Sequence, residues 1–208
     1  MKNNRLVPAL TSLAIAALLA LLLPACTRAK APETLLAPDP DVPPPAAVDD
    51  FTMESLLSEF PGHVRSADCS GRPQLVIFFL PDDPACAACI DDWNALQRDG
   101  APRGLAVFGL VPDPRPATDL RPLVAALSPA PEFPTGRADS AIITAFGSPE
   151  AIRVVPTAFL LDATGAVIRY YPGHVRPEWV REDLDAILSG APLPDHTPAG
   201  VLPEDNAA

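Results

Sequence analysis

Two patterns of apolar residues alternate through the middle of the chain. Short continuous apolar runs are typical of buried strands, and they cover residues 74–80, 105–111, 154–161 and 166–171. Apolar residues at helical spacing predict helices near residues 90–100, 120–127, 142–146 and 177–189. The order strand, helix, strand, helix, helix, strand, strand, helix predicts an α/β fold whose mixed central sheet is flanked by helices.

The last two expected strands are joined by Asp162-Ala163-Thr164-Gly165. A glycine at the end of such a short connection is typical of a hairpin with a left-handed residue. These two strands are therefore expected to be antiparallel, whereas strands joined through a helix are expected to be parallel.

Proline marks the borders of the folded part. The chain has 208 residues and 28 prolines, many of them outside the region of alternating patterns. Residues 27–48 read as an extended proline-rich linker, and residues 190–208 as a disordered proline-rich tail. One folded domain is therefore expected over residues 49–189.

The first 26 residues have the parts of an export signal. Lys2 and Arg5 precede an apolar stretch over residues 6–23, which ends at Ala25-Cys26. A cysteine directly after a small residue resembles a bacterial lipobox, in which Cys26 would carry the lipid anchor. An uncleaved anchor helix is the alternative. Either interpretation predicts a membrane-anchored domain that faces the periplasm, where cysteine pairs persist as disulfides.

The net charge of −11 argues against a nucleic-acid partner, because such proteins need basic surfaces to replace phosphate counterions. The chain also lacks the nucleophile elbow, the P-loop and the GxGxxG motif.

Candidate chemistry lies in Cys86-Ala87-Ala88-Cys89, between the first expected strand and the first expected helix. A thiolate at a helix N-terminus is stabilised by free N–H groups. Cys86 could attack a substrate disulfide, and Cys89 could resolve the mixed disulfide. Half of a zinc site and a purely structural disulfide are the alternatives.

With this motif, the sequence resembles the thioredoxin superfamily, and within it the envelope proteins of the TlpA/ResA type. The resemblance extends to residues 154–162, where Val155-Pro156-Thr157 precedes an apolar strand. It implies a cis Val155–Pro156 bond, a substrate-binding role for Val155, Pro156 and Thr157, and no cofactor beyond the Cys86–Cys89 disulfide. The implied partners are exported cysteine-containing proteins and a membrane thiol that donates electrons.

The motif departs from that family in its charge and in its first neighbour. Ala85 replaces the usual aromatic residue, and four acidic residues lie close by, namely Asp82, Asp83, Asp91 and Asp92. Negative charge disfavours a thiolate and opposes the helix N-terminus. The expected result is a Cys86 pKa only modestly lowered, in a pair that acts as a reductant.

Other residues leave alternatives open. Cys69 is expected in the core, although a third redox role is possible. Cys86, Cys89 and His174 could bind copper as in proteins of the Sco type, and a non-catalytic interaction module is a further alternative. His174 lies in Tyr171-Pro172-Gly173-His174-Val175-Arg176, which nearly repeats residues 60–65, and both copies are expected to form turns beside an edge element.

Overall fold

The computed structural model describes residues 45–147, 152 and 154–196. The chain divides into two units, residues 1–35 and 36–208, and all described residues belong to the second. Its strands are β1 (Thr52–Ser55), β2 (His63–Arg65), β3 (Gln74–Phe78), β4 (Ala106–Val111), β5 (Thr135–Arg137), β6 (Thr157–Leu161) and β7 (Val167–Pro172). Its α-helices are α1 (Pro84–Ala87), α2 (Ile90–Gly100), α3 (Ala117–Ala125), α4 (Ser140–Ala145) and α5 (Pro177–Ser189).

The strands form one mixed sheet in the order β2-β1-β5-β4-β3-β6-β7. The three central strands β3, β4 and β5 are parallel, while β6 and β7 extend the sheet as an antiparallel hairpin. Gly165 closes this hairpin with a φ of 86°, and Asp162 accepts the backbone N–H groups of Thr164 and Ala166. The mixed sheet and the predicted hairpin are confirmed.

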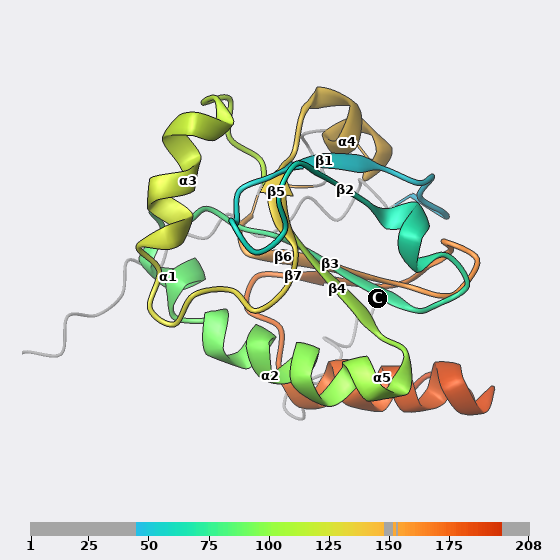
Figure 1. Ribbon diagram of the computed structural model, residues 1–208. Helices are drawn as coiled ribbons and strands as arrows, with labels where there is room; N and C mark the ends of the chain where they lie inside the picture. The colour runs from blue at the N-terminus through green and yellow to red at the C-terminus, as the bar shows by residue number, and fades with distance from the viewer. Residues whose placement is uncertain (1–44, 148–151, 153, 197–208) are drawn as a thin grey trace, which may run out of the picture. The chain divides into compact units, whose positions relative to one another are not determined.

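Alternate residues of the central strands pack into two separate cores. Leu75, Ile77 and Phe79 join α2, α3 and α5 on one face of the sheet. Val76 and Phe78 join α4 on the other face, where Phe51, Phe108, Phe146 and Phe159 form edge-to-face ring contacts. Figure 1 shows α2 beside α5 below the sheet and α4 above it. Both faces of β3 are fully buried, which explains its continuous apolar run.

Three strands were not predicted from the sequence. β1, β2 and β5 have only three or four residues and contain polar side chains such as Glu54, His63 and Arg137. They extend the sheet beyond β4, where β1 pairs antiparallel with both β2 and β5. Pairing with neighbouring strands, rather than the local pattern of apolar residues, stabilises strands this short, and the β1–β5 pairing joins residues more than 80 positions apart, as Glu54 and Arg137 show.

The described residues also include parts of the two predicted proline-rich segments. Val48 donates its N–H to the Gly165 carbonyl, and Ala47 bridges to Ala166 beside the β6–β7 hairpin. At the other end, Arg169 donates to the Pro194 carbonyl, and His196 stacks on Trp179 with ring centroids 5.1 Å apart. The first residues of the predicted tail therefore lie against β7 and α5.

Candidate functional site

The two cysteines of the motif lie where β3 leads into α2. Cys86 sits in the single turn of α1, and Cys89 is the residue that precedes the first turn of α2. The Asp83 carboxylate accepts the backbone N–H groups of Ala85 at 2.7 Å and Cys86 at 3.2 Å, and so caps α1. The expected helix start at Ile90 is confirmed, and α1 is an additional turn before it. Asp83-Pro84, a capping residue followed by proline, was the sequence signal for that turn.

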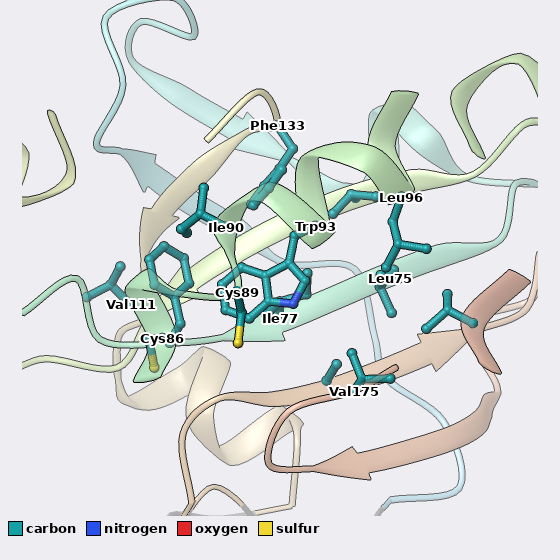
Figure 2. Packing of buried hydrophobic residues seen from close by; sticks show 14 of the residues in the cluster. Leu75, Ile77, Cys86, Cys89, Ile90, Trp93, Leu96, Val111, Phe133 and Val175 are labelled. Atoms are coloured by element: carbon teal, nitrogen blue, oxygen red, sulfur yellow. The ribbon is translucent and has the colours of Figure 1, made fainter. Parts of the chain in front are cut away.

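Both thiols are unbridged and buried. Cys86 is 0% exposed and Cys89 is 3% exposed, and both belong to the apolar core beneath α2. Figure 2 shows the two sulfur atoms with Ile90 and Trp93 of the same cluster. The Cys89 thiol donates to the Ala85 carbonyl at 3.1 Å. The two cysteines therefore lie unbridged within the apolar core.

Burial raises the pKa of both thiols. The pKa of Cys86 rises to about 12, first because burial removes water from its thiolate and further because Asp83, Cys89 and Asp82 add negative potential. A backbone hydrogen bond at Leu80 opposes this rise. The pKa of Cys89 rises to about 11, through burial and then through Asp92 and Asp83. The expected modest lowering of the Cys86 pKa is wrong, because burial outweighs what one turn of helix supplies.

The four acidic residues around the motif have different partners. Arg115 binds Asp82 at 2.9 Å and Asp113 at 2.6 Å, which ties the loop before α1 to the loop after β4. Asp92 lies 3.2 Å from the Nε2 atom of His174, the residue that follows β7 by two positions. Asp91 is exposed and lies 3.9 Å from Arg98. Neither Arg115 nor the contact between Asp92 and His174 was anticipated from the sequence.

The expected substrate-binding residues 155–157 lie at the end of the sheet where β3 leads to the cysteines. The Val155–Pro156 bond is cis, as the resemblance implied. Thr157 pairs in register with Phe78, the last residue of β3 before the loop to Cys86. Val155 is half-buried against the core that contains Cys86 and Cys89. The fold thus brings Val155, Pro156 and Thr157 to the cysteine end of the sheet.

Cys69 lies apart from this site. It ends a short 3-10 helix and is half-buried against the core on the opposite face of the sheet. This position agrees with the core interpretation, and the sheet separates Cys69 from Cys86.

The copper alternative required Cys86, Cys89 and His174 as one ligand set. Across residues 45–147, 152 and 154–196, no three His, Cys, Asp or Glu residues are placed to hold a metal ion. His174 instead contacts Asp92. The geometry gives the copper interpretation no support.

Solved structures show which fold this arrangement represents. A putative thiol:disulfide interchange protein DsbE from Chlorobium tepidum aligns over 71% of this chain and 99% of its own, with 20% identity and a TM-score of 0.57. A thioredoxin family protein from Chlorobium tepidum TLS aligns over 73% and 98%, with 24% identity and a TM-score of 0.54. The domain has a thioredoxin-like fold.

A third structure with this thioredoxin-like fold is the pneumococcal exposed lipoprotein thioredoxin Etrx1 from Streptococcus pneumoniae. It aligns over 66% of this chain and 98% of its own, with 17% identity and a TM-score of 0.57. No protein-family model matches the sequence, and no curated protein matches it. At these identities the likeness establishes the fold alone.

The expected signal peptide and Cys26 lie outside the described residues. Within the part of the chain that the structure describes, no helix is both long and apolar enough to cross a membrane.

Proposed function

We propose that this protein is a thiol:disulfide oxidoreductase of the cell envelope that reduces disulfides in exported proteins. The observation that carries the proposal is the pair of unbridged thiols at the start of α2, beside the Val155–Pro156 loop of a thioredoxin-like domain. Neighbouring cysteines at a helix start can alternate between dithiol and disulfide. No further cofactor is needed for this chemistry.

The proposed reaction has two exchange steps. The Cys86 thiolate attacks one sulfur of the substrate disulfide, so that a Cys86–substrate disulfide forms and the other substrate sulfur leaves as a thiolate and takes up a proton. Cys89 then loses its proton and attacks Cys86, which forms the Cys86–Cys89 disulfide and releases the second substrate thiol. Two electrons pass from the protein to the substrate, and a membrane thiol donor is proposed to restore the dithiol.

The raised pKa values support the reducing direction. Strongly oxidising members of this fold stabilise their reduced form by a low thiolate pKa. Here burial and the nearby carboxylates raise the pKa of Cys86 to about 12, so the dithiol gains no such stabilisation. Because Cys86 is 0% exposed, a substrate reaches its sulfur only after the surrounding loops move.

The redox potential of the Cys86–Cys89 pair tests this function. The full-length chain is equilibrated with glutathione or dithiothreitol buffers, and a potential of roughly −200 to −280 mV is expected. A value well below about −300 mV would identify a structural bridge, and one near about −120 mV an oxidant. Cys89→Ser is expected to trap Cys86–substrate disulfides with exported proteins, while Cys86→Ser traps none.

The proposed location follows from the N-terminal sequence. Residues 1–26 are proposed as a signal peptide, and Cys26 as the lipidated residue that anchors the periplasm-facing domain through the linker at residues 27–48. Incorporation of a labelled fatty acid by the wild-type chain, and its loss in Cys26→Ser, is the expected result. Equal labelling of both chains would refute the anchor.

A further inference from the structure

A cavity of about 280 Å³ lies at the end of β3 opposite the cysteines. Gln74, the first residue of β3, lines it together with the last residue of β6 and the turn of the β6–β7 hairpin. Residues 48–51 and the serines at positions 66 and 70 form the rest of its lining. Because β3 leads to the cysteine motif from its other end, the cavity is separate from the proposed redox site.

Gln74 brings a buried polar group to this cavity. The residue is 7% exposed and points to the same face of the sheet as Val76 and Phe78, which pack in the core beside α4. Its Oε1 atom is buried and accepts no hydrogen bond from the described residues. Buried carbonyl oxygens are nearly always paired, because leaving one without a donor is costly. A donor bound in the cavity can supply the missing hydrogen bond.

Asp49 and Asp50 give the cavity its charge. Both residues are exposed, and no Lys, Arg or His is among the described residues that line the cavity with them. The hydroxyl of the buried Ser66 donates to Asp50 at 3.3 Å and accepts the N–H of Phe51 at 2.8 Å. A buried hydroxyl thus holds Asp50 in place. With two carboxylates and no cation in the lining, the cavity favours a positively charged ligand.

The wall formed by residues 48–51 is fixed to the hairpin. Val48 donates its N–H to the Gly165 carbonyl at 2.9 Å. Gly165 has a φ of 86°, and a Cβ atom there would lie 2.9 Å from the Val48 carbonyl oxygen. The absence of a side chain at Gly165 therefore lets the two segments close against each other. The cavity is bounded by two segments that are bonded to each other, and it does not lie on a single loop.

The acceptors in the cavity match a primary ammonium group. Among the residues that the structure describes, no three His, Cys, Asp or Glu side chains are placed to hold a metal ion. An ammonium group carries one positive charge and three N–H donors, and it has no acceptor. The Gln74 amide oxygen and the carboxylates of Asp49 and Asp50 offer one acceptor group for each donor.

We propose that this cavity binds a primary ammonium group, from a lysine side chain of a partner protein or from a small free amine. The ammonium group donates a hydrogen bond to Gln74 and pairs with Asp49 and Asp50. The proposal uses neither thiol, so it stands apart from the proposed function.

The chain contains a matched control for Gln74. Gln97 also has a buried Oε1 atom that accepts no hydrogen bond from the described residues. It lies in α2, which packs on the opposite face of the sheet, and it does not line this cavity. Replacing Gln97 therefore removes the same kind of unpaired oxygen at a different place.

The experiment titrates the full-length protein with butylammonium chloride at pH 7 and follows its backbone amide chemical shifts by NMR. Saturable shifts are expected at residues 48–51, Gln74 and Gly165, with a dissociation constant of about 1–10 mM. Gln74→Met should weaken binding about tenfold, because it removes the buried acceptor and keeps the side-chain length. Asp50→Asn, which removes one exposed charge, should weaken it about threefold. Gln97→Met should bind as the wild type does.

The neutral probe 1-butanol separates charge from apolar contact, because it has the same carbon chain without the ammonium group. It should cause no saturable shifts at these residues. Putrescine and a blocked Gly-Lys-Gly peptide then distinguish the two sources of the group. Tighter binding of the peptide than of butylammonium assigns a lysine of a partner protein, and tighter binding of putrescine assigns a free amine.

Three results would overturn the proposal. The first is the absence of saturable shifts with any of the amines, and the second is equal binding of butylammonium and 1-butanol. The third is that Gln74→Met and Asp50→Asn both bind as Gln97→Met does. The redox potential of the Cys86–Cys89 pair is measured independently, so the proposed function is unaffected by any of these results.

Discussion

Two buried ionisable groups of the described residues, Cys86 and Asp183, have neighbours of opposite charge. Cys86 and Asp183 are each 0% exposed. Asp183 is surrounded by donors and cations: it accepts hydrogen bonds from Tyr171 and from Arg169, and it lies 2.9 Å from His196. Cys86 instead faces carboxylates, and its thiol keeps the proton.

This difference shows how a buried site becomes either structural or reactive. A buried charge that is matched by its neighbours holds distant elements together, here β7, α5 and the tail residue His196. A buried group that stays neutral, because burial and nearby like charge disfavour its charged form, makes no ion pair that joins elements. It becomes charged only when its surroundings change. The Asp183 cluster is therefore expected to control stability, and the cysteine site to control reactivity.

The largest effect, on the free energy of unfolding, is expected when Asp183 loses its carboxylate. Asp183→Ala removes the acceptor of the Tyr171 hydroxyl and of the Arg169 Nε–H group, and leaves Arg169 with the Pro194 carbonyl alone among the described residues. We expect a loss of about 3 kcal/mol in the free energy of unfolding, or about 150-fold in the folding equilibrium, measured by urea denaturation. The control is Asp185→Ala in the same helix, because Asp185 is exposed and pairs with Arg103 at the surface. That variant should lose less than about 1 kcal/mol, and equal losses would contradict the comparison.

The next effect concerns the pH dependence of the cysteine site. With a Cys86 pKa of about 12, the alkylation rate of Cys86 should rise about 100-fold between pH 8 and pH 10. In urea-unfolded protein, where the pKa returns to its ordinary 9.0, the rise should be about tenfold and should level off. Iodoacetamide labelling followed by mass spectrometry of the Cys86 peptide measures both. Identical profiles in the two states would show that burial does not raise the pKa.

The same pKa values fix the sign of the stability change with pH. Both thiols have a folded pKa above their unfolded value of 9.0, so their contribution to stability is fully present below pH 9. It is lost as the pH rises toward 11 and 12, because the unfolded chain then releases protons that the folded chain retains. The oxidised protein has no titrating thiols at these positions and should lose less stability over this range.

The comparison also shows what the sequence can predict. β3, β4 and the helices that cover them were predicted because their apolar patterns are complete within one segment. The cysteine motif and the Val155–Pro156 bond were likewise visible as short motifs. The short strand β5 and the donors around Asp183 were not visible, since Tyr171, Asp183 and His196 meet only after folding. The predicted direction of the Cys86 pKa shift was wrong for the same reason, because the burial of Cys86 depends on tertiary contacts.

The smallest effect tests whether charge, beyond burial, keeps Cys86 protonated. Asp83→Asn removes a carboxylate that raises the Cys86 pKa, while asparagine caps a helix as well as aspartate does. The Cys86 pKa should fall, and its alkylation rate at pH 8 should rise about threefold. Asp91→Asn is the matched control, because Asp91 is exposed beside Arg98 and is not among the groups that shift the pKa of Cys86. Equal rates in the two variants would assign the whole shift to burial. A rise with Asp83→Asn alone would show that negative charge beside Cys86 helps to keep its thiol protonated. The two buried sites would then differ in the charge of their surroundings, since Asp183 lies beside the cationic Arg169.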